Sequence, residues 1–130
     1  SNGSRSAACF ITEPRAMMSK KKQRTDDRCP VEFVDILGHR FRIVYSCDLS
    51  DEELGRCETT HQVLVINERQ GSDSIRDTCL HEVQHAIANL VGFPPSGSAP
   101  PEEDYISRMT TGLRCVMLQN PVFCEWVFSR

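Results

Sequence analysis

One stretch of the chain decides its fold and its chemistry: Asp77-Thr78-Cys79-Leu80-His81-Glu82-Val83-Gln84-His85-Ala86-Ile87-Ala88-Asn89-Leu90. It contains two histidines four residues apart, with a glutamate directly after the first. On an α-helix, residues four apart lie one above the other, so His81 and His85 point in the same direction. Two neutral imidazoles at that spacing can bind one Zn²⁺, and Glu82 can reach a water beside the metal as general base.

The residues around this motif predict the helix that the chemistry needs. The segment 72–74 (Ser-Asp-Ser) offers N-cap candidates, no Pro or Gly occurs between 74 and 91, and Gly92 and Pro94 end the helix. The histidines lie about 130–170° from the middle of an apolar stripe, so one face packs in the core while the other meets a cleft. The stripe consists of Leu80, Val83, Ile87, Leu90 and Val91. A helix with two surface histidines is the alternative, but it does not explain Glu82.

Length and charge narrow the class of protein. A chain of 130 residues predicts one domain with a genuine core. The net charge of −3, from 15 basic and 18 acidic residues, gives no general attraction to nucleic acid or to an anionic membrane. No apolar run is long enough to span a bilayer, so we expect no membrane partner.

The cysteines indicate a redox setting. There are seven, an odd number, with no C-x-x-C pair and no apolar signal sequence at the start. A disulfide scaffold favours an even count in a secreted chain. We therefore expect free thiols that pack as small hydrophobic side chains, in a reducing, cytoplasmic setting.

The chain divides into a leader and a domain. Residues 1–29 are predicted to be a disordered leader with a basic run at 19–24, and a solvated tail is favoured over a nucleic-acid contact. The pair Met17-Met18 offers a natural start, in which case the residues before it are vector-derived. Residues 30–130 are predicted to form the domain.

The first half of the domain predicts a small sheet. Segment 31–37 is a short strand or helix, and 40–46 alternates apolar and polar residues as a half-buried strand does. Segment 48–56 is an acidic turn or helical turn that ends at Gly55. Segment 61–67, with its β-branched centre, is the clearest strand and is expected to border the cleft, where an extended peptide could add to its edge. The expected fold class is α+β.

A second helix is predicted after the breaker-rich loop at 92–101. It begins at Pro101 or Glu102, because Pro suits the first helical position and acids suit the first turn. Gln119-Asn120-Pro121 ends it, and the apolar tail 122–128 is expected to pack back on the core. Its predicted apolar stripe is Ile106, Met109, Leu113, Val116 and Met117.

This second helix offers the third metal ligand. Catalytic zinc usually takes three protein ligands and a water, and Glu102 and Glu103 open the helix shortly after His85. Glu102 lies within about 10–20° of the centre of the inward stripe, whereas Glu103 is nearly 90° away. We favour Glu102, with Glu103 as the alternative. Both can also be ordinary acids of a first helical turn.

The order of these features resembles a known family. Two strands, the helix with His81-Glu82-x-x-His85, a loop and a helix that starts Glu102-Glu103 resemble the small zincin-like metallopeptidases of the ImmA/IrrE-like kind, especially their compact phage and prophage versions. The resemblance covers about residues 36–121. It implies a minimal zincin-like domain with a gluzincin-type site, in which His81, His85 and a Glu bind Zn²⁺ and Glu82 is the base. The chain shows no helix-turn-helix segment, which leaves the substrate open.

The expected function is zinc-dependent hydrolysis of a protein or peptide substrate. Tyr105, one turn after Glu102, is a candidate second electrophile for the oxyanion, and His61 and Arg114 are others. A non-catalytic metal-binding module that holds a partner protein is the alternative. A nucleic-acid-binding protein that uses the basic leader is disfavoured by the charge balance. The sequence does not predict an oligomeric state.

Overall fold

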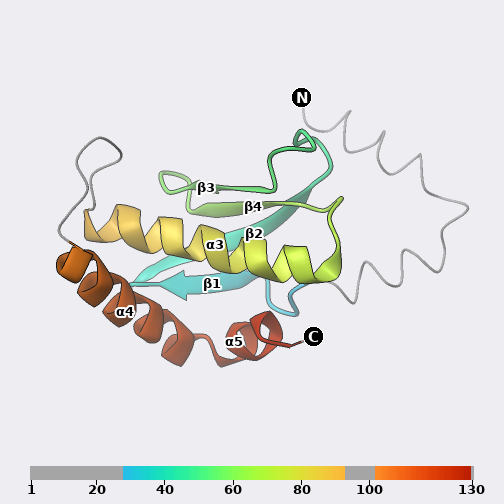
Figure 1. Cartoon of the computed structure of the whole chain (residues 1–130). Coiled ribbons are helices and arrows are strands. Elements are labelled where there is room, and N and C mark those ends of the chain that lie inside the picture. The colour runs from blue at the N-terminus through green and yellow to red at the C-terminus, as the bar shows by residue number, and fades with distance from the viewer. Residues whose placement is uncertain (1–27, 93–101, 130) are drawn as a thin grey trace, which may run out of the picture.

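The computed structural model describes residues 28–92 and 102–129. They form an α+β arrangement, as predicted, in which four strands precede three helices (Figure 1). In chain order the elements are β1 (Phe33–Ile36), β2 (His39–Ser46), β3 (Gly55–Glu58), β4 (Val63–Asn67), α3 (Ser72–Val91), α4 (Glu102–Gln119) and α5 (Pro121–Val127). The predicted leader, apart from its last two residues, lies outside the described residues.

The strands form one mixed sheet in the order β1-β2-β4-β3. The central pair, β2 and β4, is parallel, and β1 and β3 join its two edges antiparallel. Leu37 and Gly38, with φ of 49° and 86°, connect β1 to β2 as a two-residue turn, which suits the twist of a hairpin. The strands predicted at 40–46 and 61–67 are confirmed, and 31–37 contains a strand rather than a helix.

The edge of the sheet that lies beside α3 belongs to β3, a strand that the sequence did not predict. Segment 48–56 does contain a turn, closed by the Glu53 N–H on the Ser50 carbonyl at 3.1 Å, but Gly55 begins β3 instead of ending the segment. β4 is an inner strand, paired on both sides. The expectation that 61–67 supplies the free edge is therefore wrong, and β3 takes that place.

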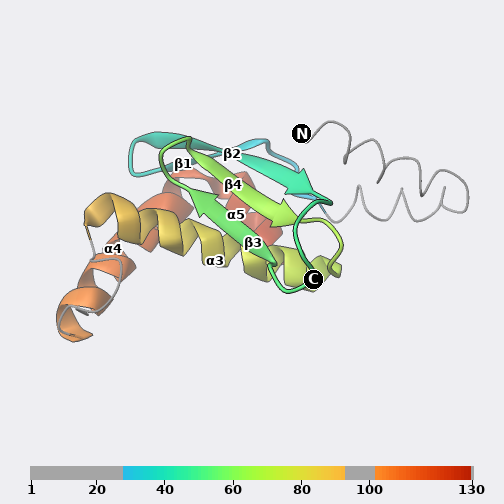
Figure 2. The ribbon, with the colours of Figure 1, turned by 90° about the horizontal axis from the view of Figure 1, so that it is seen from above.

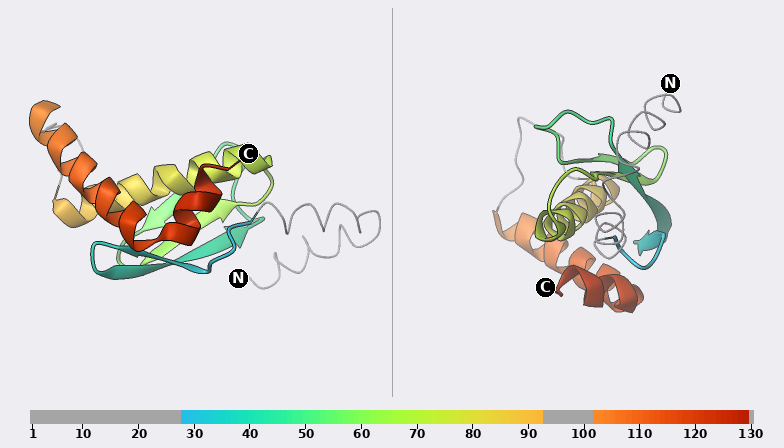
Figure 3. Two further views of the ribbon diagram at one scale, coloured as in Figure 1. Left: turned by 90° about the horizontal axis from the view of Figure 1, so that it is seen from below. Right: turned by 90° about the vertical axis from the view of Figure 1, so that its right-hand side faces the viewer.

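One face of the sheet is apolar and is covered by all three helices (Figures 2 and 3). α3 lies against β3 and β4, α4 packs on α3 and β1, and α5 packs on α3 and α4. Alternate strand residues point into this layer and are buried. They are Val34, Ile36, Phe41, Ile43, Leu64 and Ile66.

α3 buries a face slightly different from the predicted stripe. Leu80, Leu90 and Val91 are only partly buried, while Glu82 is on the buried side. The buried residues of the helix are Ile75, Thr78, Cys79, Glu82, Val83, Ala86 and Ile87. The predicted end at Gly92 is confirmed by its φ of 86°.

The predicted N-cap of α3 is wrong. Gly71 is the cap, with extended backbone and no side-chain cap hydrogen bond, and Ser72 is already helical. The Ser74 hydroxyl donates to the Gln70 side chain instead. Ser74 therefore binds the loop before the helix and does not cap the helix.

α4 begins at Glu102, as predicted, but its first turns are not covered. Met109, Gly112 and Val116 are buried, whereas Ile106 is 47% exposed, so its place in the apolar stripe is wrong. The close approach to α3 comes later, at Gly112, where an added Cβ would lie 2.6 Å from Ile87 Cγ2. The tail 122–128 packs on the core as expected, in the form of the helix α5.

The cysteines depart from expectation at one position. Five described cysteines are free thiols, namely Cys29, Cys57, Cys79, Cys115 and Cys124. Cys47 is disulfide-bonded, so the expectation of free thiols is wrong there. An odd number of cysteines indicates that at least one is free, but it does not predict which ones form a disulfide. Among the described helices, none has the length and apolar character required to cross a bilayer.

Candidate functional site

The two motif histidines meet on the exposed side of α3. Their Nε2 atoms lie 3.1 Å apart, and their rings pack edge to face with centroids 4.7 Å apart. Two nitrogens bound to one Zn²⁺ at about 2.0–2.1 Å in tetrahedral geometry lie about 3.3 Å apart. The separation of His81 and His85 therefore fits two neighbouring ligands of one metal ion.

Glu82 lies on the other side of the same turn, between α3 and β3. Glu82 is 5% exposed, and no described residue donates a hydrogen bond to its carboxylate. Burial raises the pKa of Glu82, the nearby histidines oppose this, and the negative charge of Glu53 raises it further. A buried carboxylate with a raised pKa and no internal partner is a stronger base than an exposed glutamate.

A glycine lets the strand approach this carboxylate. A Cβ added to Gly55 would lie 2.5 Å from Thr78 Cγ2 and 3.0 Å from Glu82 Oε2. Only a residue without a side chain fits there without displacing its neighbours. β3 and α3 can therefore form the two walls of one narrow site.

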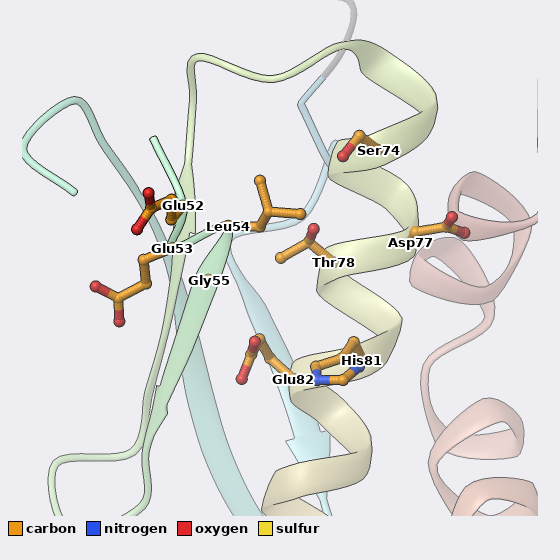
Figure 4. Close-up of a pocket in the computed structure, with 9 residues that line it drawn as sticks. All are labelled: Glu52, Glu53, Leu54, Gly55, Ser74, Asp77, Thr78, His81 and Glu82. Carbon is orange, nitrogen blue, oxygen red and sulfur yellow. The ribbon is translucent and has the colours of Figure 1, made fainter. Parts of the chain in front are cut away.

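The space between these walls is a cleft with two parts that share Gly55, His81 and Glu82. The larger part, about 470 Å³, lies toward the start of α3 (Figure 4). Besides the shared residues it is lined by Glu52, Glu53, Leu54, Ser74, Asp77 and Thr78. The smaller part, about 330 Å³, is lined in addition by Arg56, Cys57, His85 and Asn89.

Hydrogen bonds from Gln70 hold β3 beside α3. The Gln70 amide nitrogen donates to the carbonyl oxygens of Leu54 at 2.9 Å and Asn67 at 2.7 Å. Its amide oxygen accepts from Thr78 Oγ1 at 3.0 Å. One side chain in the loop before α3 thus links the start of β3, the end of β4 and the second turn of the helix.

The structure does not bring the predicted third ligand to the histidines. Glu102 and Glu103 are both exposed in the first turn of α4, although the helical phase predicted Glu102 to face inward. Among the described residues, no group of three or more His, Cys, Asp and Glu side chains could hold a metal ion. The phase argument fails because α4 packs on α3 only from Met109 onward. The assignment of Glu102 or Glu103 as ligand stays a prediction.

The candidate electrophiles also lie elsewhere. Tyr105 is 42% exposed near the start of α4. His61 has a side chain that is 76% exposed, stands in the turn before β4 and lies 3.8 Å from Glu58. Neither residue lines either part of the cleft, and Arg114 does not line it either.

The sequence did not identify four residues that line the smaller part of the cleft, namely Gly55, Arg56, Cys57 and Asn89, nor the acids Glu52, Glu53 and Asp77 of the larger part. Asn89 follows His85 by four positions and so lies on the same helical face, a spacing that could have identified it. Its side chain donates to Thr59 Oγ1 at 2.7 Å. Arg56 and Cys57 carried no signal because β3 itself was not predicted.

Comparison of the chain with protein-family models, curated proteins and solved structures finds no match.

Proposed function

We propose that this domain is a zinc-dependent peptidase, in which His81 and His85 bind the metal and Glu82 is the general base. One observation carries the proposal: two imidazole nitrogens 3.1 Å apart stand beside a buried carboxylate that has no hydrogen-bond partner among the described residues. Surface histidines alone need no such carboxylate. Zn²⁺ bound there would supply Lewis acidity toward a carbonyl oxygen and toward water.

The roles of the protein groups follow from their positions. Glu82 takes a proton from the attacking water and returns it to the leaving amine. Its place against β3 limits its exposure to water, and this burial raises the pKa of Glu82. β3 pairs with β4 along one edge only, so its other edge can hydrogen-bond an extended peptide backbone and hold it across the cleft.

The metal site needs a third protein ligand, and we propose that Glu102 or Glu103 supplies it. This requires the first two turns of α4 to lie closer to α3 than they do in this structure. Arg108, near the end of these two turns, donates a hydrogen bond to the Val91 carbonyl of α3 at 3.3 Å. The buried part of α4 begins after Arg108, at Met109, so the first two turns can move without displacing it.

A metal-binding module without catalysis is the second candidate. The exposed positions of Glu102 and Glu103 favour it, since two histidines alone can hold a metal that serves only to organise a binding surface. The two candidates differ at Glu82, because metal binding does not need that carboxylate whereas hydrolysis does.

The test compares the purified protein with Glu82→Gln and His85→Ala. Elemental analysis should give about one zinc per chain in the first two proteins and little in the third. Cleavage of a defined peptide library should occur only with the unchanged protein, and Glu82→Gln should lower the rate by at least about 100-fold. Zinc in His85→Ala at the level of the unchanged protein contradicts the metal site. If zinc is bound as expected but no peptide is cleaved, the result supports the metal-binding module and contradicts the peptidase.

A further inference from the structure

The larger part of the cleft has an unusual distribution of charge. Its lining contains carboxylates at four positions and no Lys or Arg. They are Glu52, Glu53, Asp77 and Glu82. The smaller part of the cleft, in contrast, contains Arg56. Apart from Glu82, which lines both parts, the carboxylates of the cleft therefore lie on one side of the histidine pair.

Most of this charge is not compensated by the protein. Arg56 binds Glu53 through two hydrogen bonds of 2.9 and 2.8 Å. Glu52 and Asp77 form no ion pair with any described residue. Glu52 lies on the strand side of the space, whereas the Asp77 side chain leaves α3 on the side away from β3 (Figure 4).

A buried carboxylate lies at the inner wall of the same space. Glu82 is 5% exposed and its carboxylate points between α3 and β3, where no described group donates a hydrogen bond to it (Figure 4). Burying a carboxylate without a partner costs free energy, and a cation nearby recovers part of it. This observation is independent of Glu52 and indicates the same kind of ligand.

The shape of the space suits a long basic side chain. Gly55, Ser74 and Thr78 are small, and Leu54 adds an apolar surface along which a methylene chain can lie. A volume of about 470 Å³ is within the range of ligand pockets. A Lys or Arg side chain can place its stem against Leu54 and its charge beside Glu52.

We propose that this part of the cleft is a subsite for a Lys or Arg side chain of the peptide substrate. The inference rests on the proposed peptidase function and specifies its substrate class. Because the acids other than Glu82 lie only toward the start of α3, the basic residue occupies one side of the cleaved bond and not the other.

The experiment measures binding separately from cleavage. Acetyl-Gly-Lys-Gly-amide and its norleucine counterpart, which lacks only the charge, are titrated into the ¹⁵N-labelled full chain at low salt. We expect the lysine peptide to bind about three- to tenfold more tightly and to shift amide signals at 52–55 and 74–78. The variant Glu52→Gln should lose most of this preference. The control Glu32→Gln changes the net charge equally outside the cleft and should keep it.

Each result of this experiment either supports or overturns the proposed subsite. Equal binding of the two peptides, no binding of either, or equal loss of preference in the control variant overturns the subsite. A lysine preference that depends on Glu52, without hydrolysis of any library peptide, supports the subsite and overturns the peptidase. Hydrolysis with basic residues enriched on one side of the cleaved bond supports both.

Discussion

Gly55 of β3 and Thr78 of α3 are in such close contact that a Cβ at position 55 would lie 2.5 Å from Thr78 Cγ2. We expect Gly55→Ala to lower the free energy of unfolding by about 1–3 kcal/mol, because strand and helix must separate to admit the methyl group. The same shift moves β3 away from Glu82 and should lower kcat of the proposed peptidase. Urea unfolding and initial rates measure the two effects.

Two further variants test this cause. Thr78→Ser removes Cγ2 but keeps the hydroxyl that donates to Gln70, so it should restore part of the stability of Gly55→Ala. Gly71→Ala is the control, since a Cβ there meets nothing within 4 Å. A loss in Gly71→Ala as large as in Gly55→Ala would show that the contact of Gly55 with Thr78 is not the cause.

Zinc should stabilise the folded protein through the histidine pair. Free zinc at 100 times its Kd adds about 2.7 kcal/mol to the free energy of unfolding, and His85→Ala should abolish the gain.

Of Glu102→Gln and Glu103→Gln, the one that removes a ligand should weaken zinc binding by at least about tenfold. Asp104→Asn, in the same turn, is the matched control. Unchanged affinity in both glutamate variants would exclude Glu102 and Glu103 as the third ligand.

The titration of Tyr45 should make the free energy of unfolding depend on pH. Its hydroxyl accepts a hydrogen bond from the Cys29 N–H at 2.9 Å, and burial raises the pKa of Tyr45 above its ordinary value of 10.0. Above pH 10 the unfolded chain loses this proton while the folded chain keeps it, so the free energy of unfolding falls as pH rises. The contribution is fully present below pH 10.

The variant Tyr45→Phe isolates that contribution. At neutral pH it should cost about 0.5–1.5 kcal/mol through the lost hydrogen bond. Between pH 9 and 11 its stability should fall less steeply than that of the unchanged protein. Parallel curves of unfolding free energy against pH would contradict the assignment to Tyr45.

Asn120 should be one of the most sensitive positions. Its side-chain oxygen accepts from the Asp35 N–H at 2.9 Å, and its nitrogen donates to the carbonyls of Asp35 at 2.7 Å and Val116 at 2.8 Å. Asn120→Ala removes three hydrogen bonds from a site that is 9% exposed, and we expect a loss of about 2–4 kcal/mol in urea unfolding. Gln119→Ala, one residue earlier and exposed, should cost much less.

The sequence predicted what depends on local pattern. The helix around His81 and His85 follows from its unbroken length and its stop at Gly92, and β2 and β4 follow from alternation and β-branched residues. β3 escaped prediction because Gly55-Arg56-Cys57-Glu58 has no apolar alternation of its own. It is a strand because β4 offers a partner, and a partner is a tertiary property.

The site was predicted less completely for a similar reason. The spacing of the motif places His81, Glu82 and His85, but the burial of Glu82 depends on how closely Gly55 approaches the helix. The position of Glu102 depends on where α4 meets α3, which the contact of Gly112 with Ile87 decides. Helical phase gives the direction of a side chain and not the presence of a neighbour.

The bond between Asn120 and β1 also sets an order of events in folding. Its partners are 85 positions apart, whereas β1 and β2 are joined by a two-residue turn. Closing so long a loop carries an entropic cost that only a formed nucleus can offset. During synthesis on the ribosome the hairpin can form early, but β1 obtains its clamp only after residue 120 has emerged from the exit tunnel.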